Sequence, residues 1–64
     1  MDRSEIEMIV EKLRSREIEE YLVSKVDFMA FREVLVKEED FKYFRGIAQH
    51  QGAVIYTYMD EARS

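Results

Sequence analysis

The residues able to do acid–base or metal chemistry are few and widely separated. The chain contains one His and no Cys. His50 lies in the segment AQHQG, where we expect the end of a helix, and a His ring there often faces terminal carbonyls or the helix dipole. Its neighbours offer no plausible pairing of base and nucleophile. We therefore expect no catalytic residue and no enzyme activity.

The acidic segment KEED, residues 37–40, is the nearest approach to a cation site. A calcium loop needs alternating oxygen ligands, a central Gly and a terminal Glu, and that spacing is absent here. A zinc site with thiolate ligands is excluded because the chain has no Cys. We expect no metal and no cofactor.

The length of the chain limits it to one domain, residues 1–64. A chain of this size buries only about 60% of the surface that its unfolded form exposes. Small domains usually gain stability from disulfides, a metal or a partner chain. Because the first two are excluded here, we expect a homodimer, another protein as partner, or both.

Charge and hydropathy indicate where the protein works. The first residues carry acids and no long apolar run, so we expect no secretory signal, no membrane association and a cytoplasmic location. The net charge of −4 disfavours bulk nucleic-acid binding. A small nucleic-acid-associated regulator is the alternative, and an ordered basic stripe of Arg14, Arg16, Lys42 and Arg45 would favour it.

The first half of the chain reads as two helices. Ser4 and Glu7 form a capping-box pattern, and Ile6, Ile9, Val10 and Leu13 give the apolar stripe of a helix beginning near residue 5. The phase of the stripe slips at Ser15, which favours a second short helix over about 16–24.

The stretch DFMAFREVL, residues 27–35, is echoed by DFKYFRGIA, residues 40–48. Thirteen residues rotate a helix by about 220°, so the two pairs of Phe would not share one face of a continuous rod. Two separate helices fit better, each capped by its own Asp, Asp27 or Asp40. Four Phe residues are then expected in the core: Phe28, Phe31, Phe41 and Phe44.

The segment AVIYTYM, residues 53–59, follows Gly52, which predicts a helix stop. Its β-branched and aromatic residues are typical of strands. Three states are open: a final helix, slightly favoured, a strand paired with a second chain, or a strand paired with EYLVSKV, residues 20–26. The expected fold is an all-α array, a small helical bundle of about four short helices.

Residues 41–59 contain no acid and five aromatic residues. This composition is typical of protein interfaces, although a deeply buried helix would also explain it. We expect an aromatic surface for protein–protein interaction, with Tyr56 and Tyr58 as anchors. Six residues are expected to bind the partner: Tyr43, Arg45, Ile55, Tyr56, Tyr58 and Met59.

The segment DFMAFREVLV, with KEEDFKYFRGIAQHQG after it, resembles the last helices of the BART-like domain of proteins that bind Arf-like GTPases. The resemblance rests on six positions: Asp27, Phe28, Phe31, Arg32, Val34 and Leu35. It covers about half the chain, and the upstream helices of that longer domain are missing here. It implies recognition of a partner helix in a helical groove.

Overall fold

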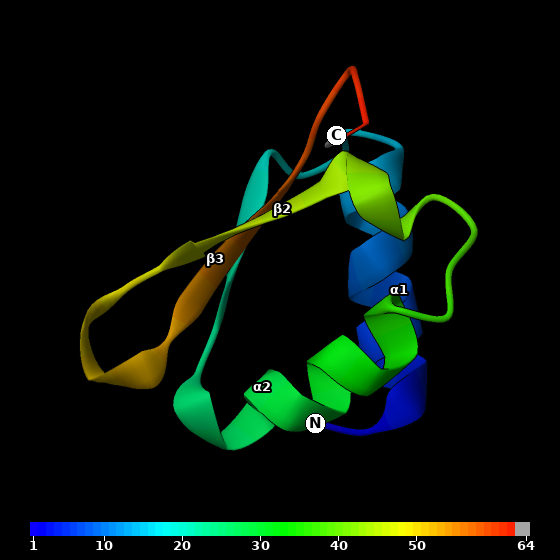
Figure 1. Ribbon diagram of the computed structural model, residues 1–64. Helices are drawn as coiled ribbons and strands as arrows, with labels where there is room; N and C mark the ends of the chain where they lie inside the picture. The colour runs from blue at the N-terminus through cyan, green and yellow to red at the C-terminus, as the bar shows by residue number, and fades with distance from the viewer. Residues whose placement is uncertain (63–64) are drawn as a thin grey trace.

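Two helices pack on one side of a three-stranded antiparallel sheet (Figure 1). The computed structural model describes residues 1–62. In chain order the elements are α1 (Arg3–Arg14), β1 (Glu20–Val23), α2 (Lys25–Leu35), the 3-10 turn η1 (Phe41–Tyr43), β2 (Phe44–Ala48), the 3-10 turn η2 (His50–Gly52) and β3 (Val54–Tyr58). The predicted all-α helical bundle is therefore wrong, and the fold is mixed α/β.

Helix α1 buries three of the four residues of the predicted apolar stripe, and the fourth, Ile9, is partly buried against the core. Ile6, Val10 and Leu13 lie at spacings of four and three residues and are almost fully buried. The helix begins two residues earlier than expected, because Asp2 caps it by accepting from the Glu5 N–H at 2.9 Å. Ser4 lies inside the first turn rather than at the cap.

The helix predicted over 16–24 does not form. Arg16 adopts a positive φ of 67°, and its N–H donates to the Leu13 carbonyl, which ends α1. The chain then enters β1, where Leu22 is exposed and Val23 is buried. The phase slip at Ser15 was a change from helix to strand, because a strand alternates its two faces residue by residue.

Helix α2 contains the first copy of the repeat. It begins at Lys25 with Ser24 as the N-cap residue, so Asp27 lies in the first turn and is not the cap. The Asp27 carboxylate instead accepts from the Ser24 hydroxyl at 3.1 Å and from the amino group of Met1 at 3.2 Å. Phe31 is fully buried and Phe28 is half-buried.

The second copy of the repeat is not a helix. After the single turn η1, residues 44–48 continue as strand β2. Asp40 makes no capping bond to the backbone through its side chain. Phe44 is buried as expected, whereas Phe41 is only half-buried. The prediction of two matched helices is wrong because the partner strand, and not the local motif, decides the state of 44–48.

Strand β3 is the centre of the sheet, with the order β1–β3–β2. Of the three states open for residues 53–59, the strand paired with the segment after Glu20 is the one observed. The favoured helix and the intermolecular strand are both wrong. The β2–β3 connection needs Gly52, which has a φ of +78° and leaves no room for a Cβ beside Lys25.

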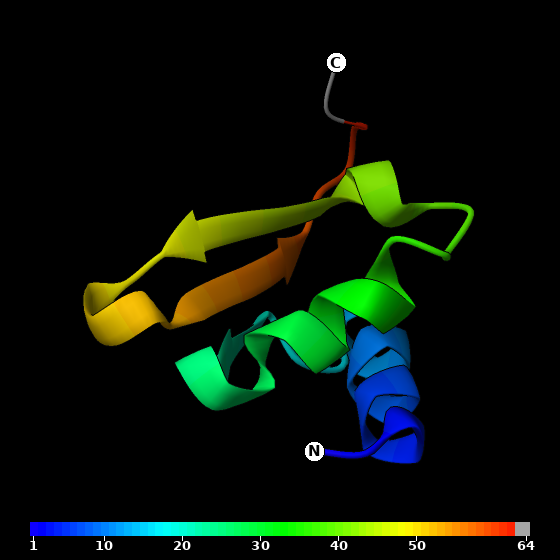
Figure 2. The same cartoon turned by 60° about the horizontal axis from the view of Figure 1, so that its bottom comes forward.

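The two helices lie together on one side of the sheet (Figure 2), and the buried side chains of the core come from both helices and strands. Phe31 of α2 stacks on Tyr56 of β3 with ring centroids 5.0 Å apart. Phe44 meets Tyr58 edge to face at 4.9 Å. Eight residues form the buried cluster: Ile6, Val10, Leu13, Val23, Phe31, Leu35, Phe44 and Tyr56.

Candidate interaction surface

The two faces of the sheet have opposite roles. The strand register sets Phe44 beside Tyr58 and Gly46 beside Tyr56, and these side chains point toward the helices. Residues between them point to the other side, because side chains alternate along a strand. The six residues on that other side, called here the outer face, are Glu20, Leu22, Arg45, Ile47, Ile55 and Thr57.

The outer face consists of two rows that run across all three strands. Leu22 of β1 pairs with Ile55 of β3, which pairs with Ile47 of β2, and we call this the apolar row. Glu20, Thr57 and Arg45 form the second row in the same strand order, and we call it the charged row. The charged row therefore has a carboxylate at one edge of the sheet and a guanidinium at the other.

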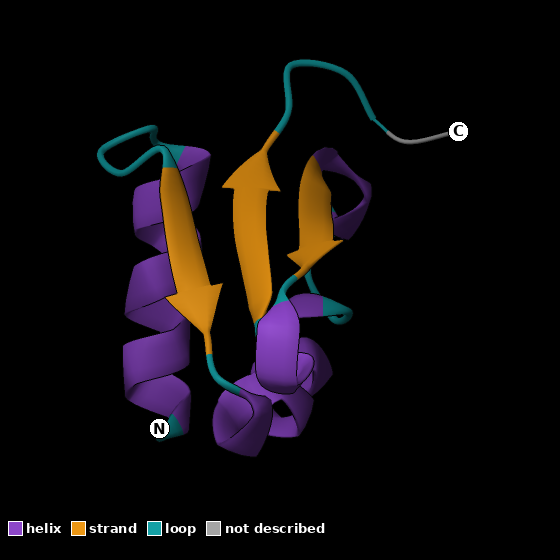
Figure 3. Ribbon diagram, turned by 90° about the vertical axis from the view of Figure 1, so that its left-hand side faces the viewer, coloured by secondary structure: helices purple, strands orange, loops and turns teal. Residues whose placement is uncertain are grey.

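The outer face is open to solvent. Figure 3 looks onto it, with α1 behind the strands and no helix crossing in front of them. Leu22 is 58% exposed and Ile47 is 39% exposed. Apolar side chains in a continuous exposed row are typical of a surface that binds another protein.

A shallow depression extends the apolar row toward α2 and the β2–β3 connection. Its apolar lining includes Leu22, Ile55, Ala53 and Val26, and Val26 is 90% exposed. His50, within η2, also lines it. The exposed apolar surface therefore continues beyond the strands themselves.

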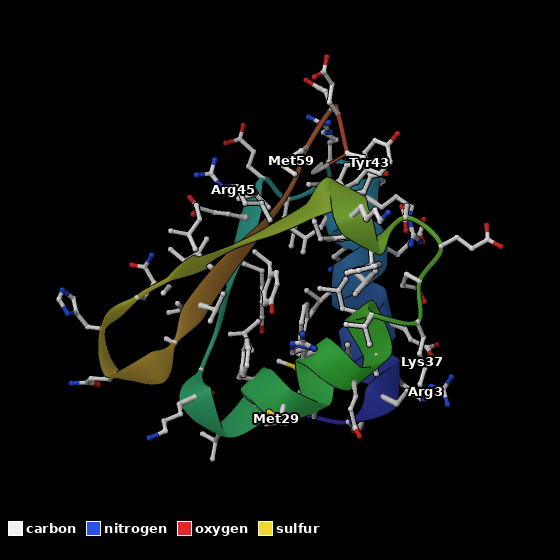
Figure 4. All side chains as sticks on the ribbon, in the orientation of Figure 1. Arg3, Met29, Lys37, Tyr43, Arg45 and Met59 are labelled. Atoms are coloured by element: carbon white, nitrogen blue, oxygen red, sulfur yellow. The ribbon has the colours of Figure 1, made fainter. Side chains whose placement is uncertain are left out.

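Tyr43 and Met59 lie together at one corner of the sheet (Figure 4), and Tyr58 joins them through its contact with Tyr43. The rings of Tyr43 and Tyr58 stack with centroids 5.7 Å apart. The Met59 N–H donates to the Tyr43 carbonyl at 2.7 Å. The Arg16 guanidinium lies 5.6 Å from the centre of the Tyr58 ring. The Tyr58 ring packs against the core on the helix side of the sheet, so it does not belong to the outer face.

An ion-pair cluster ties α1 to the loop after α2. The Arg14 guanidinium donates two hydrogen bonds to Asp40 and one to Glu38, all at 2.8 Å, and a fourth to Glu11 at 2.6 Å. The hydroxyl of Tyr58 donates to the same Asp40 carboxylate at 3.0 Å. These charge-assisted bonds hold the start of the second repeat, at Asp40, against helix α1.

The cluster shifts the pKa values of its members. Hydrogen bonds from Arg14 lower the pKa of Asp40 below its ordinary value, against a smaller opposing effect of burial. Hydrogen bonds to Asp40 and Glu38 raise the pKa of Arg14. Burial, and then the hydrogen bond to Asp40, raise the pKa of Tyr58. All three shifts favour the protonation states that hold the cluster together.

The lowered pKa of Asp40 predicts an acid-sensitive domain. Because the folded pKa lies below the unfolded one, the ionised carboxylate stabilises the fold at neutral pH, and this stabilisation is lost as the pH falls through the folded pKa. We expect Asp40→Asn to lower stability near neutral pH and to flatten its decline between about pH 5 and pH 2. Urea unfolding at a series of pH values measures both effects. Asp60→Asn, at a carboxylate that is 88% exposed, is the control, and an equal flattening in both variants would contradict the assignment.

Gly46 lines an apolar hollow between α2 and strand β2, where it has no side chain to fill the space. A Cβ at this position would lie 3.1 Å from Val54 Cγ1 and 3.2 Å from Tyr56 Cε1. Its absence lets the Tyr56 ring lie across the edge strand, a known way to cover a strand glycine. Phe28 and Phe41 line the same hollow beside the Tyr56 ring. Gly46, which falls inside the helix predicted for residues 40–48, instead lies in strand β2, where it makes room for the Tyr56 ring.

Residues 1–62 lack two features. Among these residues no group of three or more His, Cys, Asp or Glu residues is placed to hold a metal ion. Neither helix within this range has the length and hydropathy to cross a bilayer.

The six residues predicted to bind a partner fall into three places. Arg45 and Ile55 lie on the outer face. Tyr56 is only 7% exposed and belongs to the core. The remaining three form the corner described above: Tyr43, Tyr58 and Met59.

Sequence reasoning missed Leu22, Ile47 and Glu20 as surface residues. The alternation in EYLV and FRGIA was the available signal, since it indicates one exposed and one covered face. Because these segments were predicted to be helices, their residues were assigned to faces with a period of 3.6 residues instead of two, and the alternation was not recognised.

This architecture defines a small α/β domain with two helices on one face of a three-stranded antiparallel sheet and an exposed apolar row on the other. A family model described as YkzS-like protein matches residues 3–57. The chain belongs to the YkzS-like protein family. Comparisons with curated proteins and with solved structures gave no match.

The resemblance to the BART-like domain is wrong. The matching family is a different one, and it covers nearly the whole chain. The fold agrees with this correction, because only the first copy of the repeat starts a long helix and residues 44–48 are a strand. A groove between helices of that domain therefore has no counterpart here.

Proposed function

We propose that this protein is a non-enzymatic interaction module that binds another protein chain through the outer face of its sheet. The single observation that carries the proposal is the apolar row, in which Leu22 and Ile47 are exposed and Ile55 between them is partly exposed, although the domain has little core to spare. An exposed apolar strip on a sheet is stabilised when a partner covers it.

The location of the shifted pKa values supports a non-enzymatic role. Arg14, Asp40 and Tyr58 bind one another in a structural cluster away from the outer face. Structural ion pairs shift pKa values as active sites do, so the shifts alone do not indicate catalysis. We further propose that the module works in the cytoplasm.

No observation favours the nucleic-acid alternative. The stripe that would support it is broken, because Arg14 is held by Asp40 and neighbouring acids, and Arg16 is paired with Asp60. Neutralised guanidinium groups contribute little to binding of phosphates. Arg45 lies on the outer face opposite Thr57, two residues before Ile47 on the same strand.

Variants of the apolar row test the proposal. We expect Leu22→Asp and Ile47→Asp each to reduce capture of partner chains by at least about tenfold, since a charge placed in the apolar centre of an interface is strongly unfavourable. Both positions are exposed, so melting temperatures should change little. Immobilised wild type and variants are compared by quantitative mass spectrometry of the proteins retained from the host extract and of added free chain.

Met29→Asp is the matched control, because Met29 is 68% exposed and lies on α2 outside the outer face. It should retain the same partners as the wild type. If all three variants lose the same partners, or if none does, the outer face is not the binding surface.

A further inference from the structure

We infer that the occupant of the outer face is a second copy of this chain, packed sheet to sheet about a two-fold axis parallel to the strands. The inference rests on the proposed function, since it names the partner of the same surface. It is carried by the arrangement of the two rows, which is self-complementary in both charge and apolar character.

The geometry follows from the strand order. A two-fold axis that runs along β3, midway between two facing sheets, keeps each residue at its height along the strands and exchanges the two edges. Strand β1 of one copy then lies over β2 of the other, and β3 lies over β3. Each residue of the outer face of one sheet therefore faces a definite residue of the other sheet.

In the apolar row this operation produces continuous contact. Leu22 lies over Ile47 of the second copy, Ile47 over its Leu22, and Ile55 over Ile55 at the axis. Aligned sheets pack about 10 Å apart with interdigitating side chains, a distance that such aliphatic side chains fill. The most exposed apolar residues of the sheet are thereby covered.

In the charged row the same operation produces opposite charges. Glu20 of β1 lies over Arg45 of the second copy, and Arg45 lies over its Glu20. Within one chain these two residues lie on opposite edges of the sheet, and neither forms an ion pair with the described residues. The dimer gains two cross-pairs at its rim, where charge fixes register and partner choice.

Packing about an axis across the strands does not give this match. That axis keeps β1 over β1 and reverses the height along each strand, so Glu20 and Arg45 no longer face each other. Charge complementarity therefore selects the parallel axis. It also distinguishes a second copy from an unrelated partner, whose charges need not mirror this chain.

The area indicates how tight the dimer is. Three strands about 4.8 Å apart and five residues of about 3.3 Å give a footprint of roughly 14 by 16 Å. The area of this footprint is well below the roughly 800 Å² that each partner buries in a standard interface. We therefore expect a weak dimer in concentration-dependent exchange with the monomer, formed by a domain whose core is small.

A charge-swap series tests the inference by sedimentation equilibrium of the whole chain over a wide concentration range. The wild type should show a monomer–dimer equilibrium. Glu20→Arg alone and Arg45→Glu alone should each weaken dimerisation roughly tenfold, because both cross-pairs become repulsive. The double variant, which restores both pairs with the charges exchanged, should return to within about threefold of the wild type.

Two control variants carry the same changes of charge elsewhere. Glu33→Arg on α2 matches Glu20→Arg, and Lys37→Glu matches Arg45→Glu. Figure 4 shows Lys37 on the side of the molecule away from Arg45. Both controls should dimerise like the wild type, and circular dichroism should show all variants folded.

Three results overturn the inference: a wild type that stays monomeric at the highest concentrations, a double variant that stays as weak as the single ones, or controls that weaken dimerisation equally. The first of these leaves the proposed function testable on its own. If other proteins still bind and are lost in Leu22→Asp and Ile47→Asp, the outer face is a binding surface for them and the self-partner is wrong.

Discussion

Replacing Phe31 with Ala should remove most of the stability of this domain. Phe31 is fully buried and stacks on Tyr56, so its loss breaks the main contact between α2 and the central strand. A buried Phe→Ala change costs about 3–5 kcal/mol, whereas a domain of this length has about 3–10 kcal/mol in total. Urea unfolding followed by circular dichroism measures the loss.

Met29→Ala on the same helix is the control, because Met29 is 68% exposed. It should change the free energy of unfolding by less than about 0.5 kcal/mol. A Phe31→Ala variant as stable as the control would mean that the Phe31–Tyr56 stack does not hold the helix to the sheet.

The second large effect is expected at Arg14, where Arg14→Ala should cost about 1–2 kcal/mol. The side chain joins α1 to Glu38 and Asp40, and its removal leaves these acids close together without a cation. The expected cost is near the lower end for charged hydrogen bonds because the Arg14 side chain is 30% exposed and therefore partly screened.

Arg14→Lys separates geometry from charge. A lysine keeps the positive charge but not the planar fork that donates two bonds to Asp40, so it should recover only part of the loss. Thermal unfolding at low and high salt measures both variants. Full recovery by Lys, or an Arg14→Ala variant that melts like the wild type, would show that the bidentate bond to Asp40 is not stabilising.

Parts of the fold were predictable from local pattern. The stripe of Ile6, Val10 and Leu13 identified α1, and DFMAFREVL identified most of α2. The burial of Phe31 and Phe44 was also predictable, since large aromatic residues at regular spacing are seldom left exposed. These features depend on residues within one or two turns of each other.

The sheet was not predictable in the same way. Residues 44–48 repeat a segment that forms helix elsewhere in the same chain, so their state depends on pairing with Val54–Tyr58. Strand propensity reflects packing against neighbouring strands more than an intrinsic preference. The candidate surface shared this uncertainty, because Leu22 and Ile47 become neighbours of Ile55 only after the strands pair.

By itself, the sequence determined that this is one short chain without Cys, with one His, and with two amphipathic segments suited to helices. Those properties follow from composition and from contacts between near neighbours. The tertiary structure decided which face of each strand is covered, since the helices occupy only one side of the sheet. It thereby buried Tyr56 and turned Leu22, Ile47 and the partly exposed Ile55 to the other side, because a strand that packs one face must turn the alternate residues outward.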